Sequence, residues 1–191
     1  WFKEFLDKVG HDNACLIMHT DVKDQHGQDL EAIIHELGLV NGEVLFSRDK
    51  VNAEYLAGMY NMADLTICIS DAEGFGLSTL ESLSCGTPIL VNMTGGLQDQ
   101  VTDGEKFFGI GLHPASKAII GSQQVPFIYE DRLSKDDFVN ALVELYEMTP
   151  EARKELGLAG RGWAEDRFGF DKFIQTWDDL FTSIHEEKGS W

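Results

Sequence analysis

The stretch that decides the fold is ADLTICISDAEGFGLSTLESLSCGTPILVNMTGG, which spans residues 63–96. It opens with an apolar segment, 64–70, whose β-branched residues are typical of a strand. The E-G-F-G sequence that follows predicts a tight turn, and 78–85 has the composition of a short helix. A second apolar segment, 88–92, completes the stretch. It therefore predicts a strand, a glycine-rich turn, a helix and a second strand.

The same alternation continues on both sides of this unit. Short apolar segments alternate with segments whose apolar residues recur at helical spacing, such as Leu30, Ile34 and Leu37. This pattern predicts an α/β fold, a Rossmann-like doubly wound parallel sheet with helices on both faces. Ligands bind beyond the carboxyl ends of such strands, which here are 70–78 and 92–97. We expect strands at 13–19, 43–47, 64–70, 88–92 and 106–112, and helices at 27–39, 52–63, 78–85 and 96–104.

The C-terminal part of the chain, 134–187, is predicted to be entirely helical. Ser134 resembles an N-cap, and three consecutive amphipathic segments follow. The segment 113–132, between sheet and tail, fits neither period and predicts a folded excursion or an active-site flap. The three helices are expected at 134–149, 150–168 and 171–187. The apolar residues of the last helix predict a packed face: Trp177, Leu180, Phe181 and Ile184.

The charge of the chain limits its partners. Its 191 residues suit one domain and carry a formal net charge of −18. Nucleic acids and anionic membranes bind through Lys and Arg, so this balance argues against both. No apolar segment approaches the roughly 20 residues that cross a bilayer, and no secretory signal is visible. We expect a cytoplasmic protein with buried, reduced thiols at Cys15, Cys68 and Cys85.

The glycine-rich turn has the chemistry of an anion site. The backbone amides of Leu77, Ser78 and Thr79 would open the helix without intrahelical partners and point along the positive end of its dipole. Such amides bind phosphate without cations, and glycines let the backbone approach a ligand. Glu81 in the helix and Glu73 on the loop could each accept hydrogen bonds from a sugar. The spacing suits a nucleotide sugar; the plainer alternative is a tight turn with a solvated Glu73.

The stretch resembles the donor-site signature of the retaining glycosyltransferases of GT-B fold, in particular the large family 4 group. That signature is E-x(7)-E: an acidic residue, G-F-G, a helix with a second Glu, then small-G-x-P, a strand and G-G. Most of the chain resembles the C-terminal, donor-binding domain of that family. The matching positions are Glu73, Gly74, Phe75, Gly76, Glu81, Gly86, Pro88, Gly95 and Gly96.

The resemblance implies a role for each part of the site. Glu81 would bind the ribose hydroxyls, and Glu73 would contact the transferred sugar near its reacting face as the catalytic residue. The backbone of 74–76 would line the sugar, the amides of 77–79 would hold the diphosphate, and Arg48 would lie beside the base. Gly95 and Gly96 belong to the same donor-binding set. The family transfers a hexose with retention to a glycan or glycoconjugate and needs no metal at the donor.

The sequence also departs from that family. The family holds the diphosphate with an Arg and a Lys after the domain's first strand, and this chain starts at Trp1 in what reads as the next helix. The resemblance therefore implies that the first strand and the acceptor domain belong to a longer protein, and that this chain alone is inactive. Any membrane contact would also belong to that domain. Lys23, Arg48 and Lys117 are only weak substitutes for these cations, with a solvated surface role as the alternative, and Asp99 stands where the family usually has Glu.

Two other functions stay open on the sequence. A nucleotide-sugar epimerase of the same fold would use acid and base residues from both domains. A non-catalytic interaction module would keep the fold without the chemistry, against which the intact pair Glu73 and Glu81 argues. No metal site is expected, because the spacing of the histidines is not that of a ligand set. These histidines are His19, His26, His35 and His113.

Overall fold

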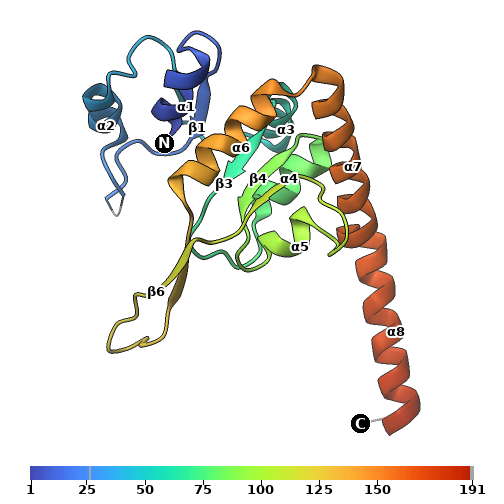
Figure 1. The fold of residues 1–191 in the computed structure, drawn as a ribbon. Helices are drawn as coiled ribbons and strands as arrows, with labels where there is room; N and C mark the ends of the chain where they lie inside the picture. Colours follow the sequence, from blue (N-terminus) through green and yellow to red (C-terminus); the bar gives the residue numbers. More distant parts are fainter. Residues whose placement is uncertain (26, 190–191) are drawn as a thin grey trace.

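A computed structural model describes residues 1–25 and 27–189 and shows parallel strands with helices on both sides (Figure 1). Helices and strands alternate up to residue 112, as predicted. The alternating elements are α1 (Phe2–Val9), β1 (Leu16–His19), α2 (Leu30–Leu37), β2 (Val44–Ser47), α3 (Ala53–Met62), β3 (Thr66–Cys68), α4 (Leu77–Cys85), β4 (Ile89–Asn92), α5 (Leu97–Val101) and β5 (Ile110–Leu112). They are followed by β6 (Ser116–Ile119), β7 (Tyr129–Arg132), α6 (Lys135–Glu147), α7 (Pro150–Phe168) and α8 (Phe170–Lys188).

Several of these helices are capped at their N-termini by the side chain of the residue that precedes the first turn. The Asn52 side chain accepts a hydrogen bond from the Tyr55 amide at 2.9 Å and caps α3. Ser134 caps α6 in the same way, and Thr149 caps α7 ahead of Pro150 in its first turn. Such caps satisfy amides that have no partner inside the helix. The local sequence therefore sets these boundaries, which is why they were predictable to within about two residues.

The strands form two parallel sheets, whereas the alternation predicted one. β1 pairs with β2, and β3, β4 and β5 form a second sheet in that order. Among the described residues no ladder of hydrogen bonds joins β1 to β3. Hydrophobic periodicity identifies strands but not their neighbours, so the sequence could not reveal this interruption.

The core lies on both faces of β4, which is buried along its whole length. Successive side chains of a strand point to opposite faces of the sheet. Leu90 accordingly packs on one face with Phe5 of α1 and Phe138 of α6. Ile89 and Val91 pack on the other face, in a cluster that includes residues of α4, α5 and α7. The predicted α/β fold, with parallel strands covered by helices on both faces, is confirmed.

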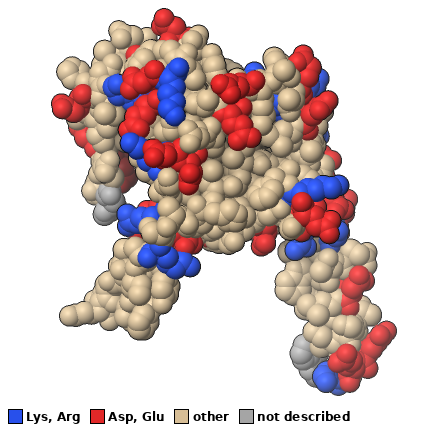
Figure 2. All heavy atoms as spheres, viewed as in Figure 1, with Lys and Arg blue, Asp and Glu red and all other residues tan. Residues whose placement is uncertain are grey.

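The segment 113–132, which fitted neither period, is a hairpin built from β6 and β7. Its base is attached to the loops that follow β3 and β4. The Asp131 amide donates to the Asp71 carbonyl at 2.7 Å, and the Thr94 hydroxyl donates to the Asp131 carboxylate at 2.8 Å. Asn92 donates to the Asp131 carbonyl at 2.6 Å. The arm beyond this base projects from the body and carries no charged residue from 118 to 129 (Figure 2).

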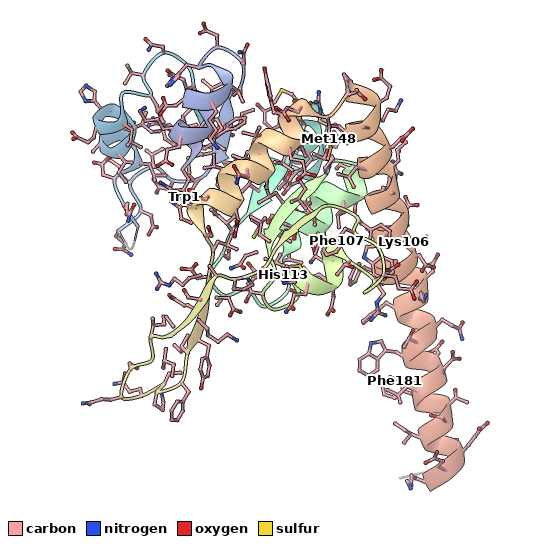
Figure 3. All side chains as sticks on the ribbon, viewed as in Figure 1. Trp1, Lys106, Phe107, His113, Met148 and Phe181 are labelled. Carbon is pink, nitrogen blue, oxygen red and sulfur yellow. The ribbon has the colours of Figure 1, made fainter. Side chains whose placement is uncertain are left out.

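The last helix, α8, also projects from the body, and none of its described residues is buried (Figures 1 and 3). The prediction that this helix has a packed apolar face is therefore wrong for this chain by itself. Trp177 and Leu180 are each 44% exposed, and Phe181 is 56% exposed. Trp177 and Phe181 instead contact each other at 5.4 Å between ring centroids. None of the described helices is long and apolar enough to cross a membrane.

Candidate active site

The glycine-rich turn lies directly after β3 and leads into α4, as predicted. Gly76 is the N-cap of α4, with a left-handed conformation at φ 89°. A Cβ at this position would lie 2.5 Å from the Leu97 side chain, so glycine is required for both reasons. The first amide to bond within the helix is that of Leu80, to the Gly76 carbonyl at 3.2 Å. The preceding helical amides, 77–79, therefore have no carbonyl partner inside the helix, and they lie at the carboxyl edge of the sheet.

A buried glutamine, which the sequence interpretation did not identify, supports this turn. Gln100 lies on α5 and is completely buried. Its Nε2 donates to the Phe75 carbonyl at 2.6 Å and to the Gly76 carbonyl at 3.0 Å. Its Oε1 lies 2.6 Å from the hydroxyl of Thr79, which is also completely buried. Every hydrogen-bonding group of the Gln100 amide is thus used to fix the turn.

Gly95 and Gly96 pack against the back of the same loop. Gly95 has φ 49°, and a Cβ there would lie 1.7 Å from the Glu73 carbonyl oxygen. The Gly96 amide donates to the Gly74 carbonyl at 3.1 Å. The two glycines therefore allow backbone to approach backbone, which holds the loop in place. Their direct contact with a ligand remains a prediction.

The two glutamates of the motif differ in their surroundings. Glu73 is half-buried on the loop, and no hydrogen bond or ion pair reaches its carboxylate from the described residues. Glu81 is exposed on α4, and its Oε2 accepts a hydrogen bond from the Tyr60 hydroxyl of α3 at 2.9 Å. Burial, and then the hydrogen bond to Glu81, raise the pKa of Tyr60 well above its usual range. Tyr60 is a second site residue that sequence reasoning missed.

The three candidate cations are all engaged in ion pairs. Arg48 contacts Glu31 at 2.5 Å, and Lys23 contacts the same carboxylate at 3.1 Å. Lys117 contacts Asp131 at 3.3 Å at the base of the hairpin. Arg48 borders a cavity of about 420 Å³ at the carboxyl ends of β1 and β2. This cavity is at the edge where the base of a nucleotide was predicted.

Two further predicted positions lie beside the turn. The ring of Phe75 is 39% exposed and meets Phe168, at the end of α7, edge to face at 5.6 Å. Asp99, which replaces the usual Glu of the family signature, is exposed on α5. Its carbonyl accepts a hydrogen bond from the Trp163 indole at 3.3 Å. The turn is therefore enclosed by α5 and α7 on its far side.

The histidines and cysteines do not gather at the site. Within 1–25 and 27–189 no group of three or more His, Cys, Asp or Glu side chains could hold a metal ion. His19 contacts the Ser47 hydroxyl at 2.9 Å, and His26 lies outside the described residues. Of the three thiols predicted to be buried, Cys15 is exposed, and the other two are partly buried.

These features fit one class of enzyme, and the comparison with known families identifies it. The family model described as Glycosyl transferases group 1 matches residues 22–163, and the chain belongs to this family. Similar curated proteins are D-inositol 3-phosphate glycosyltransferases. That of Arthrobacter sp. (strain FB24) is 32% identical over 113 residues, which are 59% of this chain and 26% of the relative. That of Streptomyces scabiei (strain 87.22) is 27% identical over 164 residues, 84% of this chain and 31% of the relative.

Solved structures share the fold over nearly the whole chain. Sucrose-phosphate synthase from Thermosynechococcus elongatus superimposes with a TM-score of 0.64 at 22% identity, covering 97% of this chain and 42% of that one. HepE from Anabaena in complex with UDP superimposes with a TM-score of 0.60 at 17% identity, covering 95% of this chain and 52% of HepE. The predicted family and the GT-B type of fold are confirmed. The chain spans only about a quarter to a third of the length of the curated relatives.

Proposed function

We propose that this chain is the donor-binding half of a retaining glycosyltransferase that transfers a hexose from a nucleoside-diphosphate sugar. The observation that carries the proposal is the turn itself. Gly76 opens α4 with free amides, Gln100 fixes the carbonyls of Phe75 and Gly76 behind them, and Glu73 and Glu81 lie on either side. Preorganised amides are what a charged diphosphate needs.

Each part of this site has a proposed task. The amides of Leu77, Ser78 and Thr79 hold the diphosphate, and Glu81 accepts hydrogen bonds from the ribose hydroxyls. Glu73 contacts the hexose, and Arg48 lies beside the base. The UDP in the complex of HepE supports a nucleotide as ligand.

The chemistry follows from charge. The bond from the anomeric carbon to the phosphate oxygen breaks, negative charge develops on the leaving diphosphate, and the acceptor hydroxyl adds to that carbon from the same face, which retains its configuration. The α4 amides stabilise that charge without reorganising, and no metal is needed in this scheme. The acceptor proton passes to the leaving phosphate oxygen. The acceptor is a glycan or glycoconjugate bound by another part of the enzyme, so the isolated chain is inactive.

The proposal is tested by comparing the binding of the nucleotide alone with the binding of the nucleotide sugar. UDP and UDP-glucose are titrated into the chain and into Glu81→Gln and Glu73→Gln variants by calorimetry. Glu81→Gln should weaken both ligands about equally. Glu73→Gln should leave UDP unchanged and weaken UDP-glucose alone. Equal affinities for both ligands in all three proteins would contradict the assigned roles. Incubating an active full-length enzyme with donor alone distinguishes a transferase from an epimerase, because only an epimerase forms a new nucleotide sugar without acceptor.

A further inference from the structure

We infer that Phe168, the last residue of α7, is a positioning residue for the glycine-rich turn, which it holds through the ring of Phe75. The two rings meet edge to face, with 5.6 Å between their centroids. The contact itself depends only on how α7 packs against the body. What the turn binds, and hence what this contact does for binding, rests on the proposed function.

The backbone and the side chain of Phe75 are held by different helices. Its carbonyl accepts a hydrogen bond from Gln100 of α5 at 2.6 Å, and a Cβ at Gly96 would lie 2.7 Å from its Cα. These contacts fix the backbone of the turn but leave the direction of the ring open. The ring is 39% exposed, and Phe168 contacts it from α7. α5 therefore holds the backbone of Phe75, and α7 holds its side chain.

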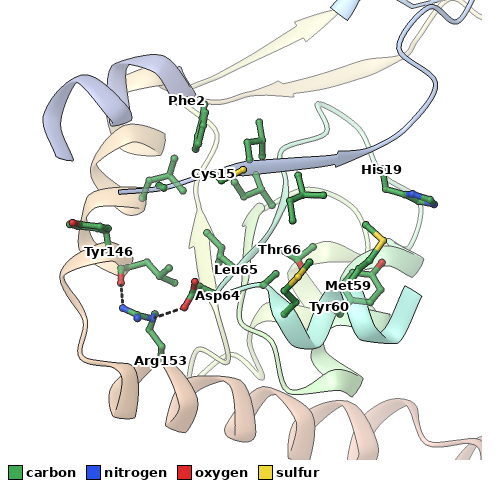
Figure 4. A pocket seen from close by; sticks show the side chains of 18 of the residues that line it. Phe2, Cys15, His19, Met59, Tyr60, Asp64, Leu65, Thr66, Tyr146 and Arg153 are labelled. Carbon is green, nitrogen blue, oxygen red and sulfur yellow. Dashed lines mark hydrogen bonds and ion pairs between the residues drawn. The ribbon is translucent and has the colours of Figure 1, made fainter. Parts of the chain in front are cut away.

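α7 can act as a fixed support because it is anchored before it reaches the turn. In its first turn, Arg153 pairs with Asp64 at 3.3 Å (Figure 4). Arg153 also donates a hydrogen bond to the Met148 carbonyl at 2.6 Å. Farther along, a Cβ at Gly157 would lie 2.0 Å from the carbonyl oxygen of Gly86. The α7 backbone therefore lies directly against the C-terminal end of α4.

α7 runs antiparallel to α4 and reaches both of its ends. Gly157 lies at the C-cap of α4, and a Cβ at Gly160 would lie 2.6 Å from the Leu83 side chain, one turn earlier in α4. Phe168 then meets Phe75, just ahead of the N-cap of α4. From Gly157 to Phe168 α7 rises about 16 Å, which is close to the length of α4, about 14 Å for its 9 residues. The contact between α7 and α4 thus places Phe168 at the turn.

A row of aromatic rings fixes Phe168 in this place. The ring of Trp163 stacks on that of Phe108 at 4.9 Å, with 9° between their planes, and meets Phe168 edge to face at 6.3 Å. Stacked and edge-to-face pairs are the geometries that aromatic rings prefer. The Trp163 indole also donates to the Asp99 carbonyl of α5 at 3.3 Å. The row therefore connects Phe108, ahead of β5, with Phe75 in the turn.

A displaced Phe75 ring should affect the sugar part of the site more than the phosphate part. In the proposed function the backbone of the turn lines the hexose, and Glu73 contacts it from the same loop. The α4 amides that would hold the diphosphate are fixed separately, because the buried Thr79 hydroxyl is bonded to Gln100 at 2.6 Å. Loss of the Phe168 ring should therefore weaken the binding of a nucleotide sugar more than that of the nucleotide alone.

The test compares Phe168→Ala with Phe173→Ala, which removes the same kind of side chain from the helix that follows. Phe173 is 56% exposed, and its ring contacts those of Phe170 and Trp177 on the same helix, α8. Both variants lose one phenyl ring and one aromatic neighbour or more. Only the first variant loses a ring that contacts the turn.

The first measurement is amide hydrogen exchange by NMR in the chain without ligand. The Gly96 amide, bonded to the Gly74 carbonyl at 3.1 Å, reports how often the loop opens. The Gly86 amide, bonded to the Leu83 carbonyl at 2.9 Å, reports on the other end of α4. Phe168→Ala should speed exchange at Gly96 about threefold to tenfold, as expected for one aromatic pair, and leave Gly86 unchanged. A general loss of stability would speed exchange at both amides.

The second measurement is the affinity for UDP and for UDP-glucose by calorimetry. In Phe168→Ala the affinity for UDP-glucose should fall about threefold to tenfold relative to that for UDP, whereas Phe173→Ala should keep the natural ratio. Equal exchange at Gly96 in the two variants, or equal affinity ratios, would overturn the inference. A natural chain that binds neither ligand would contradict the proposed function instead, and the exchange at Gly96 would then decide the role of Phe168.

Discussion

The hydroxyl of Tyr60 on α3 donates a hydrogen bond to the carboxylate of Glu81 on α4, at 2.9 Å. This contact joins two neighbouring helices at the edge where the free amides of α4 begin. It fixes one carboxylate oxygen and leaves the exposed side of Glu81 for a ligand. In the proposed function, Tyr60 therefore positions the group that binds the ribose.

Tyr60→Phe removes this hydrogen bond but keeps the ring in its place. Hydrogen bonds to charged groups contribute about 1.5–3 kcal/mol, and exposure reduces this value here, so nucleotide affinity should fall about threefold to tenfold. Calorimetry with UDP measures the change. Tyr55→Phe is the control, because Tyr55 is on the same helix and 61% exposed. Equal affinities in the two variants would remove Tyr60 from the site.

Gln100→Leu should destabilise the fold as well as the turn. It leaves the partly buried Phe75 carbonyl without its donor, whereas the Gly76 carbonyl keeps the Leu80 amide and the Thr79 hydroxyl. A buried group left unpaired costs about 1–3 kcal/mol, so we expect a loss of about 1–3 kcal/mol in the free energy of unfolding. Urea denaturation measures it. Gln98→Leu, at an exposed position of α5, should change this free energy by less than about 0.5 kcal/mol.

Comparing Gly95→Ala with Gly104→Ala distinguishes strain from a positive φ from strain caused by a steric clash of the new Cβ. Both Gly95 and Gly104 have positive φ, at 49° and 97°, which costs an alanine about 1–2 kcal/mol. Only at Gly95 does the new Cβ also meet a backbone oxygen, that of Glu73, at 1.7 Å. Gly95→Ala should therefore be less stable than Gly104→Ala by about 2 kcal/mol or more, and it should shift the loop that carries Glu73. Equal losses in urea denaturation would mean that the two loops are not packed as described.

The hairpin anchor should depend on pH. The hydrogen bond from Thr94, and then the pairing with Lys117, lower the pKa of the Asp131 carboxyl in the folded protein. In the unfolded chain an aspartate carboxyl has a pKa of about 3.9. A lowered pKa stabilises the fold above that value, and the contribution is lost as the pH falls through the folded-state pKa. The stability difference between the natural chain and Asp131→Asn should thus be full at pH 6 and shrink below about pH 4. A difference that stays constant down to pH 3 would exclude Asp131 as the cause.

The parts of the fold that were predictable are those set by local sequence. The N-cap residues, Gly76 and the apolar segments act on their own neighbours, so the order of strands and helices up to residue 112 could be predicted. Tyr60 and Gln100 could not be assigned, because their bonds join residues 21 and 24–25 positions apart. The hairpin was missed because its second strand, YEDR, has no apolar alternation and is fixed by contacts of Asp131 with the β4 edge. The gap between the sheets depends on strand neighbours, which periodicity does not specify.

The most direct test of the donor site is the melting temperature of the chain with millimolar UDP, GDP or ADP, beside Glu81→Ala and the exposed control Glu105→Ala. A nucleotide at ten times its dissociation constant stabilises the fold by about 1.4 kcal/mol, which raises Tm by roughly 3–6 °C. We predict such a rise with one of the three nucleotides in the natural chain and in Glu105→Ala, and its loss in Glu81→Ala. A rise that survives Glu81→Ala, or no rise with any nucleotide, would contradict a nucleotide site at this turn.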